Sequence, residues 1–333
     1  MEFIKQRPSD KPNEYQSAQI ARRFGMFIHF GINTFGNVEW SDGTIPVNAY
    51  RPSAIDAQQW IKTAYMAGMN YVVLITKHHD GFCMWNTDST DYCVKNSVNP
   101  TDVVGAVADA CKKYGIKLGL YYSLWDRHEK NYKTDFDGEY IPYMHRHLTE
   151  LLDGRYGEIV ELWLDGAWDK PRTSWKLEEL YNLVKQLQPQ CQIGINHTVG
   201  ADFNRAEFPE ERYLPQNYQE LDPLRMFPSD FRLWDPYPCR SDDPKLYTYQ
   251  NNTYYLPFEM TICSRDGFSW FYSNFYETIP LMDIDSVVRN CRTAFDASNL
   301  VLINMPPDIN GRLVQSDIEH LMEISSRLNL RRY

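Results

Sequence analysis

The stretch that decides the fold is Tyr71–Phe82, which reads "YVVLITKHHDGF". Its first six residues are mostly apolar and β-branched, as in a buried strand. Lysine, two histidines and an aspartate come directly after them, so these polar side chains stand at the carboxyl end of the predicted strand. Parallel α/β folds keep their functional residues at this end of their strands. The stretch therefore predicts both a fold class and the face on which chemistry would occur.

Strand-like and helix-like segments alternate on both sides of this stretch. Further strands are expected over 23–31, 116–123, 159–168, 191–196, 258–264 and 299–307. Amphipathic segments predict helices over 55–68, 102–115, 143–157, 177–189, 283–298 and 316–329. This alternation implies parallel strands, and the count fits a (β/α)8 TIM-like barrel if residues 200–255 hold one more strand among long loops. Because no linker or internal repeat is seen, we predict a single domain over 1–333.

Composition excludes several classes of protein. The net charge of −10 argues against a nucleic-acid partner, which would require a basic surface. No run of 18 apolar residues is present, so we expect no membrane span. The first residues lack the apolar core of a signal peptide, which favours the cytoplasm, or the periplasm or exterior if a signal was removed. Seven scattered cysteines without a C-x-x-C pair fit reduced thiols.

Polar or aromatic residues end four of the predicted strands. His29 ends the first, His78 and His79 follow the second, Tyr121 ends the third and Asp165 ends the fourth. The segment "ELWLDGAW" places Asp165 after an apolar run and before two small residues, which would let a ligand approach closely. A buried carboxylate of this kind suits the nucleophile or base of a glycoside hydrolase. The alternative is a helix N-cap.

A metal site is the second hypothesis for the same residues. His29, His78, His79 and Asp165 could together bind Zn²⁺ or Mn²⁺, as in barrel amidohydrolases. Such enzymes carry H-x-H on the first strand, whereas "FIHFG" contains one histidine. No nucleotide-binding glycine motif or G-x-S-x-G is present.

Several segments together resemble the α-L-fucosidases of glycoside hydrolase family 29. They are "RFGMFIHFG", "VEWSDG", "ITKHHDGFCMW", "LGLYYSLWD", "ELWLDGAW" and "NLVLINMPPDINGRL". The resemblance implies a retaining, exo-acting enzyme that releases terminal α-L-fucose from fucosylated oligosaccharides or glycoconjugates without metal or cofactor. It also implies a barrel without the C-terminal β-sandwich of many relatives. The oligomeric state stays open.

The resemblance assigns roles to individual residues. Asp165 falls on the catalytic nucleophile. For the acid/base, Glu207 in "ADFNRAEFPEERY" aligns with the family's position, and Glu259 in "YYLPFEMTIC" is the second candidate. Sugar contacts are implied for His29, Glu39, Trp40, His78, His79, Tyr121 and Trp163.

One departure from the family concerns the segment after the fifth strand. Relatives carry an arginine in an N-x-R stretch, whereas this chain reads "INHTVG", so His197 is the candidate replacement, with Arg205 and Arg212 as alternatives. This departure and the irregular interval 200–255 leave two other functions open. One is an α-L-galactosidase of the same mechanism, and the other is a non-catalytic glycan-binding barrel.

Overall fold

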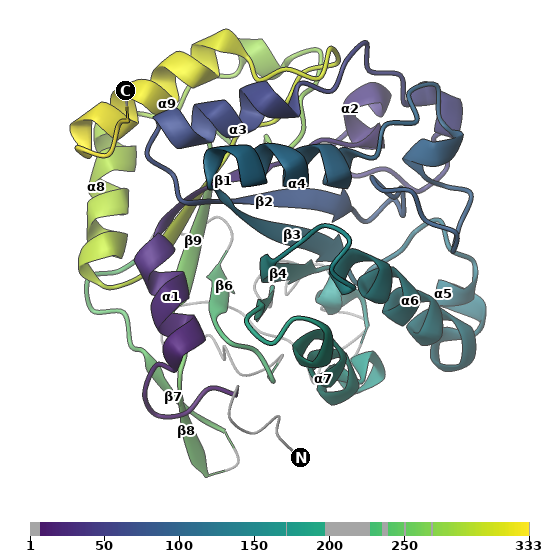
Figure 1. Cartoon of the computed structure of the whole chain (residues 1–333), viewed down its shortest axis with the longest axis horizontal. Helices are drawn as coiled ribbons and strands as arrows, with labels where there is room; N and C mark the ends of the chain where they lie inside the picture. The colour runs from purple at the N-terminus through teal and green to yellow at the C-terminus, as the bar shows by residue number, and fades with distance from the viewer. Residues whose placement is uncertain are drawn as a thin grey trace.

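A computed structural model describes residues 7–170, 172–196, 227–234, 239–249, 251–267 and 269–332. Within these ranges, eight parallel strands form one sheet in the order β5-β4-β3-β2-β1-β10-β9-β6. A parallel bridge between Gly194 and Phe231 connects the two edges of the sheet. The sheet therefore curls into a nearly closed barrel surrounded by helices (Figure 1), which confirms the predicted (β/α)8 TIM-like fold.

The barrel strands lie where the sequence pattern predicted them. They are β1 (Phe24–Ile28), β2 (Tyr71–Lys77), β3 (Lys117–Ser123), β4 (Ile159–Asp165), β5 (Gln192–Ile195), β6 (Arg232–Trp234), β9 (Phe258–Cys263) and β10 (Leu300–Asn304). The sixth strand falls inside the region 200–255, as expected. An antiparallel hairpin of β7 (Leu246–Tyr249) and β8 (Asn252–Tyr255) comes after it and was not predicted.

Six predicted helices are present and pack around the sheet (Figure 1). They are α3 (Ala57–Met66), α4 (Val103–Tyr114), α6 (Ile141–Leu152), α7 (Leu177–Leu187), α8 (Ile284–Asp296) and α9 (Gln315–Arg327). Two short helices, α2 (Ile32–Gly36) and α5 (Asn131–Thr134), lie in the loops after β1 and β3. None of the helices in the described ranges is long and apolar enough to cross a membrane.

Helix α1 (Glu14–Arg22) was not predicted, and it packs against the amino ends of the barrel strands. Asn13 caps it with a capping box, in which Asn13 and Gln16 satisfy each other's backbone N–H groups. The amide of Gln16 also donates to the carbonyl of Asp230, just before β6 (2.8 Å). The guanidinium of Arg22 donates to the carbonyl of Val160, at the start of β4 (3.5 Å).

Side chains alternate between the barrel interior and the surrounding helices, as the pleat of a strand requires. On β4, Leu162 and Leu164 belong to the apolar layer under the helices, whereas Trp163 belongs to the cluster inside the barrel. Glu161 and Asp165 share the inward direction of Trp163, because they lie two residues before and after it. One strand therefore carries two carboxyl groups into the barrel, at opposite ends.

The barrel interior is consequently divided into three levels. Apolar and aromatic side chains fill the middle: Phe27, Val73, Tyr121, Trp163 and Leu302. We call the polar groups at the carboxyl ends of the strands the upper layer: His29, His78, His79, Asp165, Asn196 and Asn304. We call those at the amino ends the lower layer: Tyr71, Glu161 and Glu259.

Candidate active site

Asp165 is the last residue of β4, and its side chain is held by two neighbours from adjacent strands. The hydroxyl of Tyr121 donates to Oδ2 (2.7 Å), and the amide of Asn196 donates to Oδ1 (3.1 Å). Burial raises the pKa of Asp165 to about 6, although both hydrogen bonds favour the charged form. At neutral pH this residue is thus an oriented but poorly solvated carboxylate, the state required of a nucleophile.

The residue after Asp165 must be glycine for the loop to turn away. Gly166 has a φ of +75°, and a Cβ there would lie 2.7 Å from the Cβ of Trp125. The "LDG" of the sequence motif therefore combines a buried carboxylate with a turn that other residues could adopt only under strain.

Three histidines gather near Asp165 in the upper layer. The ring centroids of His78 and His79 lie 4.1 Å apart, and those of His29 and His78 lie 6.2 Å apart. Nε2 of His79 lies 3.8 Å from Oδ2 of Asp165. Burial lowers the pKa of His29 to about 3 and the pKa values of His78 and His79 well below the usual range. All three rings are therefore neutral hydrogen-bonding groups rather than charges.

The adjacent histidines can both reach the site because β2 ends before them, at Lys77. Lys77 itself is fully buried and pairs with Asp126, with Nζ 3.2 Å from Oδ2. Oδ1 of Asp80 accepts the backbone N–H of Phe82 (2.7 Å). Lys77 and Asp80 thus hold the loop in place, and His78 and His79 can point into the candidate site.

Hydrogen bonds fix the tautomers of His29 and His79. Nδ1 of His29 lies 2.7 Å from Oδ1 of Asn304, whose amide N–H groups are used by backbone carbonyls. Nδ1 of His79 lies 2.7 Å from the hydroxyl of Ser123, which donates its own proton to the carbonyl of Trp125. Nδ1 therefore carries the proton in both histidines, and Nε2 is an acceptor in both.

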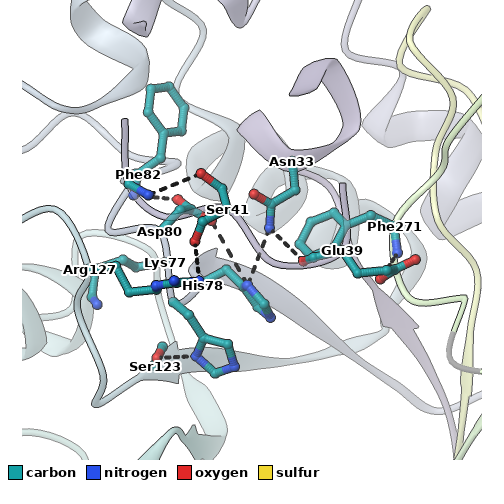
Figure 2. A network of polar contacts seen from close by, with 12 residues as sticks. Asn33, Glu39, Ser41, Lys77, His78, Asp80, Phe82, Ser123, Arg127 and Phe271 are labelled. Carbon is teal, nitrogen blue, oxygen red and sulfur yellow. Dashed lines mark hydrogen bonds and ion pairs between the residues drawn. The ribbon is translucent and has the colours of Figure 1, made fainter. Parts of the chain in front are cut away.

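His78 has the opposite tautomer. The amide nitrogen of Asn33 donates to the backbone carbonyl of Glu39 (3.1 Å) and to Nδ1 of His78 (3.3 Å), as Figure 2 shows. Nδ1 of His78 is therefore an acceptor, and its Nε2 carries the proton. This pattern bears on the metal hypothesis, because His78, His79 and Asp165 offer ligand atoms within 4.8 Å of one another. A zinc-ligating histidine normally donates its other N–H, whereas Nδ1 of His78 faces the amide of Asn33 and lies 3.9 Å from Oδ2 of Asp80, too far for such a bond, so this donor set fits a zinc site poorly.

Glu39 joins two loops above the barrel. Its Oε2 accepts the backbone N–H groups of Trp270 and Phe271, both at 3.2 Å. Figure 2 shows Glu39 beside Phe271. Burial raises the pKa of Glu39 to about 7. The next residue, Trp40, packs edge-on against His79 with 5.1 Å between ring centroids and stacks on Trp168 at 6.2 Å. Trp40 thus lies against His79, and Glu39 bonds through its backbone carbonyl to Asn33, the neighbour of His78.

Glu259 lies far from this group, contrary to its assignment as an acid/base candidate. It is the second residue of β9, four residues before the end of the strand at Cys263, so it lies about 13 Å lower in the barrel. It is fully buried, and it accepts hydrogen bonds from the hydroxyl of Tyr71 (2.7 Å) and the indole of Trp163 (3.1 Å). The structure does not bring Glu259 together with Asp165.

Two other predicted residues, Glu207 and His197, lie outside the described residues. Tyr121 and Trp163, each 1% exposed, lie in the middle level beneath the histidines, with their rings stacked at 5.5 Å. Sequence reasoning missed the residues that orient the site. These are Asn33, Ser123, Asn196 and Asn304, with the aromatic side chains of Trp125 and Trp168.

A groove of about 820 Å³ lies at the other end of the barrel, between the end of α4 and the starts of β3 and β4. Lys112, Lys117 and Arg155 contribute to its lining, and none of the predicted site residues does. The histidines and Asp165 therefore lie at the carboxyl end of the barrel, away from this groove.

Comparison with known proteins identifies relatives of the whole described barrel. The family model described as Alpha-L-fucosidase matches residues 37–331. Alpha-L-fucosidase 1 of Arabidopsis thaliana is 34% identical over 333 residues, covering 97% of this chain and 60% of that protein. A putative alpha-L-fucosidase 1 of Oryza sativa is 33% identical, covering 96% of this chain and 58% of that protein. The chain spans about 60% of the length of these relatives.

Solved structures with a similar fold come from the same family. A glycoside hydrolase 29 family member from an unknown rumen bacterium superposes with a TM-score of 0.79 at 26% identity, covering 96% of this chain and 57% of that one. Alpha-L-fucosidase isoenzyme 1 of Paenibacillus thiaminolyticus gives a TM-score of 0.74 at 27% identity, covering 95% and 75%. The sequence motifs, the barrel and these matches agree: the chain belongs to the α-L-fucosidase family, glycoside hydrolase family 29.

Proposed function

We propose that this chain is a retaining, exo-acting α-L-fucosidase that hydrolyses terminal α-L-fucosides in fucosylated oligosaccharides or glycoconjugates. The observation that carries the proposal is Asp165, a buried carboxylate oriented by Tyr121 and Asn196 beside neutral histidines at the carboxyl end of the barrel. Membership of the α-L-fucosidase family supports the choice of substrate.

In the proposed mechanism, the carboxylate of Asp165 attacks the anomeric carbon and the bond to the leaving oxygen breaks as an acid protonates that oxygen. Water, deprotonated by the same group acting as base, then hydrolyses the covalent glycosyl-enzyme. Glu207 remains our sequence-based prediction for the acid/base. A retaining pair would place its carboxyl group about 5–5.5 Å from that of Asp165. Because the pKa of Asp165 is raised only to about 6, the nucleophile is ionised at neutral pH.

The tautomers define what the site would recognise. Nε2 of His29 and Nε2 of His79 accept hydrogen bonds, whereas Nε2 of His78 donates one. A ring with several hydroxyl groups meets this pattern, because each hydroxyl can donate and accept at once. Sugar hydroxyls facing His29 and His79 would donate, and the one facing His78 would accept. This arrangement supports a carbohydrate substrate over a charged one.

We place C6 of the sugar against the apolar rings around His29, where a fucoside would be favoured over an α-L-galactoside. The ring centroids of Phe27, Trp270 and Phe271 lie 4.4, 5.1 and 5.3 Å from that of His29. Fucose has a methyl group at C6, and galactose has a hydroxymethyl group there. A hydroxyl placed against these rings would lose its water without gaining a partner, which costs about 1–3 kcal/mol. We expect kcat/KM to favour the aryl α-L-fucoside by about tenfold or more.

Initial rates with 4-nitrophenyl α-L-fucoside test the proposal. Asp165→Asn should lose at least about a thousandfold in rate, because the amide cannot act as the nucleophile. Glu207→Gln should lose less on this substrate, since nitrophenolate leaves with little protonation, and more on natural linkages. If the wild type bound fucose but hydrolysed neither the aryl α-L-fucoside nor the aryl α-L-galactoside, the result would favour the glycan-binding barrel instead.

A further inference from the structure

The lower layer contains two carboxyl groups that the proposed mechanism does not use. Glu161 and Glu259 are both fully buried inside the barrel, at the amino ends of β4 and β9. Burying such groups costs free energy, and well-packed apolar residues of similar volume are often no worse for stability. The pair therefore calls for a role other than stability.

The contacts around the pair show which carboxyl group carries a charge. Two side chains of α1 lie beside Glu161: Nη2 of Arg22 is 4.0 Å from its Oε2, and Gln19 donates to the same oxygen (3.1 Å). The donors to Glu259 are the uncharged groups of Tyr71 and Trp163. Burial and the neighbouring Glu161 raise the pKa of Glu259 well above its usual range. Since Glu161 has the cationic Arg22 beside it and the printed donors to Glu259 are uncharged, we assign the charge to Glu161 and the proton to Glu259.

From Glu259 a continuous series of contacts leads up to the nucleophile. Its Oε1 accepts the N–H of Trp163, the single polar group on that indole (3.1 Å). The indole stacks on the ring of Tyr121 with 5.5 Å between centroids and 24° between planes. The hydroxyl of Tyr121 donates to Oδ2 of Asp165 (2.7 Å). Three residues on three strands thus connect the lower layer to the upper one.

We propose that Glu259 is a positioning residue, which sets the orientation of Trp163 and, through the ring of Tyr121, the hydrogen bond on Asp165. The inference rests on the proposed role of Asp165 as nucleophile. It replaces the acid/base role predicted for Glu259 with one that fits its place in the barrel. A neutral Glu259 is sufficient for this role, because the role requires an acceptor for the indole N–H of Trp163 and not a charge.

Two variants of Glu259 separate this role from others. Glu259→Gln keeps an acceptor for Trp163 and loses the acceptor for Tyr71, which is not part of the path to Asp165, so kcat should stay within about threefold of the wild type. Glu259→Leu keeps the volume but loses the bonds from Trp163 and Tyr71, so kcat on 4-nitrophenyl α-L-fucoside should fall about tenfold with KM little changed. The acid limb of kcat/KM should move to higher pH, because a weakened bond from Tyr121 stabilises the carboxylate of Asp165 less.

The groups that face Asp165 are His79 from the end of β2, Tyr121 from β3 and Asn196 from the residue after β5. Tyr121→Phe removes one of these bonds directly and gives the largest shift to be expected. A merely structural role of Glu259 would lower the melting temperature of Glu259→Leu and leave its pH profile unchanged, which would overturn the proposal. Loss of activity in Glu259→Gln as severe as in Asp165→Asn would also overturn it, since the carboxyl group itself would then be required.

A second readout keeps the inference independent of turnover. The titration of Asp165, followed by NMR of ¹³Cγ-labelled aspartate and assigned with Asp165→Asn, should show the same upward shift in Glu259→Leu. A wild type inactive on fucosides would contradict the proposed function, and the titration would still decide this inference. If Glu259→Leu does not fold, Trp163→Phe removes the same hydrogen bond from its other end and must show the shift, and its absence would contradict the proposal.

Discussion

The upper and lower layers of the barrel both bury carboxyl groups, but they leave different atoms unpaired. In the lower layer, Tyr71 and Trp163 donate to the two carboxyl oxygens of Glu259, and Gln19 from α1 donates to Oε2 of Glu161, whose Oε1 is buried without a partner in the described ranges. In the upper layer, no residue in the described ranges bonds to Nε2 of His29 or of His78.

The difference indicates that one barrel interior both orients neighbouring side chains and offers free donors and acceptors to a substrate. Polar groups whose partners all come from the protein are fixed and unreactive, and they can orient what packs on them. Polar groups that are oriented but keep one unused donor or acceptor are prepared for a substrate. Substitutions in the upper layer should therefore lower activity most strongly, whereas a substitution in the lower layer that keeps the hydrogen bond to Trp163 should retain most activity.

The largest expected effect is the loss of the upper carboxylate. Asp165→Asn should lower kcat at least about a thousandfold, while circular dichroism and the melting curve show a folded protein. Its matched control is Glu259→Gln, the same carboxyl-to-amide change in the lower layer, which should retain most activity. Equal losses in the two variants would contradict the division of the interior into a reactive layer and a supporting layer.

The second effect concerns the hydrogen bond on the nucleophile. Tyr121→Phe should lower kcat/KM about 10- to 100-fold, because a bond to a charged group contributes about 1.5–3 kcal/mol. Tyr122→Phe is the matched control, since Tyr122 lies next on β3, is also fully buried and bonds to His147 beneath the helices (3.0 Å). That control should lower the melting temperature and leave kcat/KM almost unchanged. Equal losses of kcat/KM in Tyr121→Phe and Tyr122→Phe would contradict a specific role for the bond from Tyr121 to Asp165.

The third effect is on the pH profile of the wild type. Burial raises the pKa of Asp165 to about 6, so the free enzyme should lose its nucleophile below this pH. We expect kcat/KM for the aryl fucoside to fall about tenfold per pH unit on the acid side. An acid limb at about pH 4, the ordinary range of an aspartate, would show that the carboxylate is better solvated than its burial indicates.

The smallest expected effect is on stability. A carboxyl group whose pKa is raised on folding stabilises the protein while it is protonated. This contribution is full below the unfolded pKa of 3.8 for Asp165 and is lost as the pH rises through about 6. Glu39, raised to about 7, extends the same trend upward. The melting temperature should therefore fall by a few degrees between about pH 5 and pH 8.

The same melting curves test the source of the trend. In Asp165→Asn the change in melting temperature over this pH range should be smaller, because one of the titrating groups has been removed. An identical pH dependence in the variant and the wild type would show that the ionisation of Asp165 does not destabilise the fold.

Much of this arrangement could be predicted from the sequence, because buried strands are apolar runs and the polar residues after each run mark its carboxyl end. The same rule that selected Asp165, at the end of "ELWLD", argues against Glu259, which stands at the start of "FEMTIC". The place of Glu259 near the start of this run thus predicts a side chain at the amino end of the strand, whereas the family resemblance made it an acid/base candidate. Helix α1 was missed because its buried residues are Gln16 and Gln19, which apolar periodicity cannot detect.

The orientation of the site could not be predicted in the same way. Asn33, Asn196 and Asn304 act through side-chain geometry, which depends on strands that are distant in sequence. The tautomers of the histidines depend in turn on those amides and on Ser123. Sequence pattern can place a histidine at the end of a strand, but only the folded barrel determines which of its nitrogens carries the proton.

Chemical rescue of Asp165→Gly by azide tests the central claim most directly. If Asp165 is the nucleophile of a retaining fucosidase, azide should occupy the space left by the side chain and attack the anomeric carbon from the same face. The account predicts that azide restores turnover of 4-nitrophenyl α-L-fucoside and yields the β-L-fucosyl azide, identified by NMR. A variant that hydrolyses the substrate without azide at the wild-type rate, or a rescue product of α configuration, would contradict it.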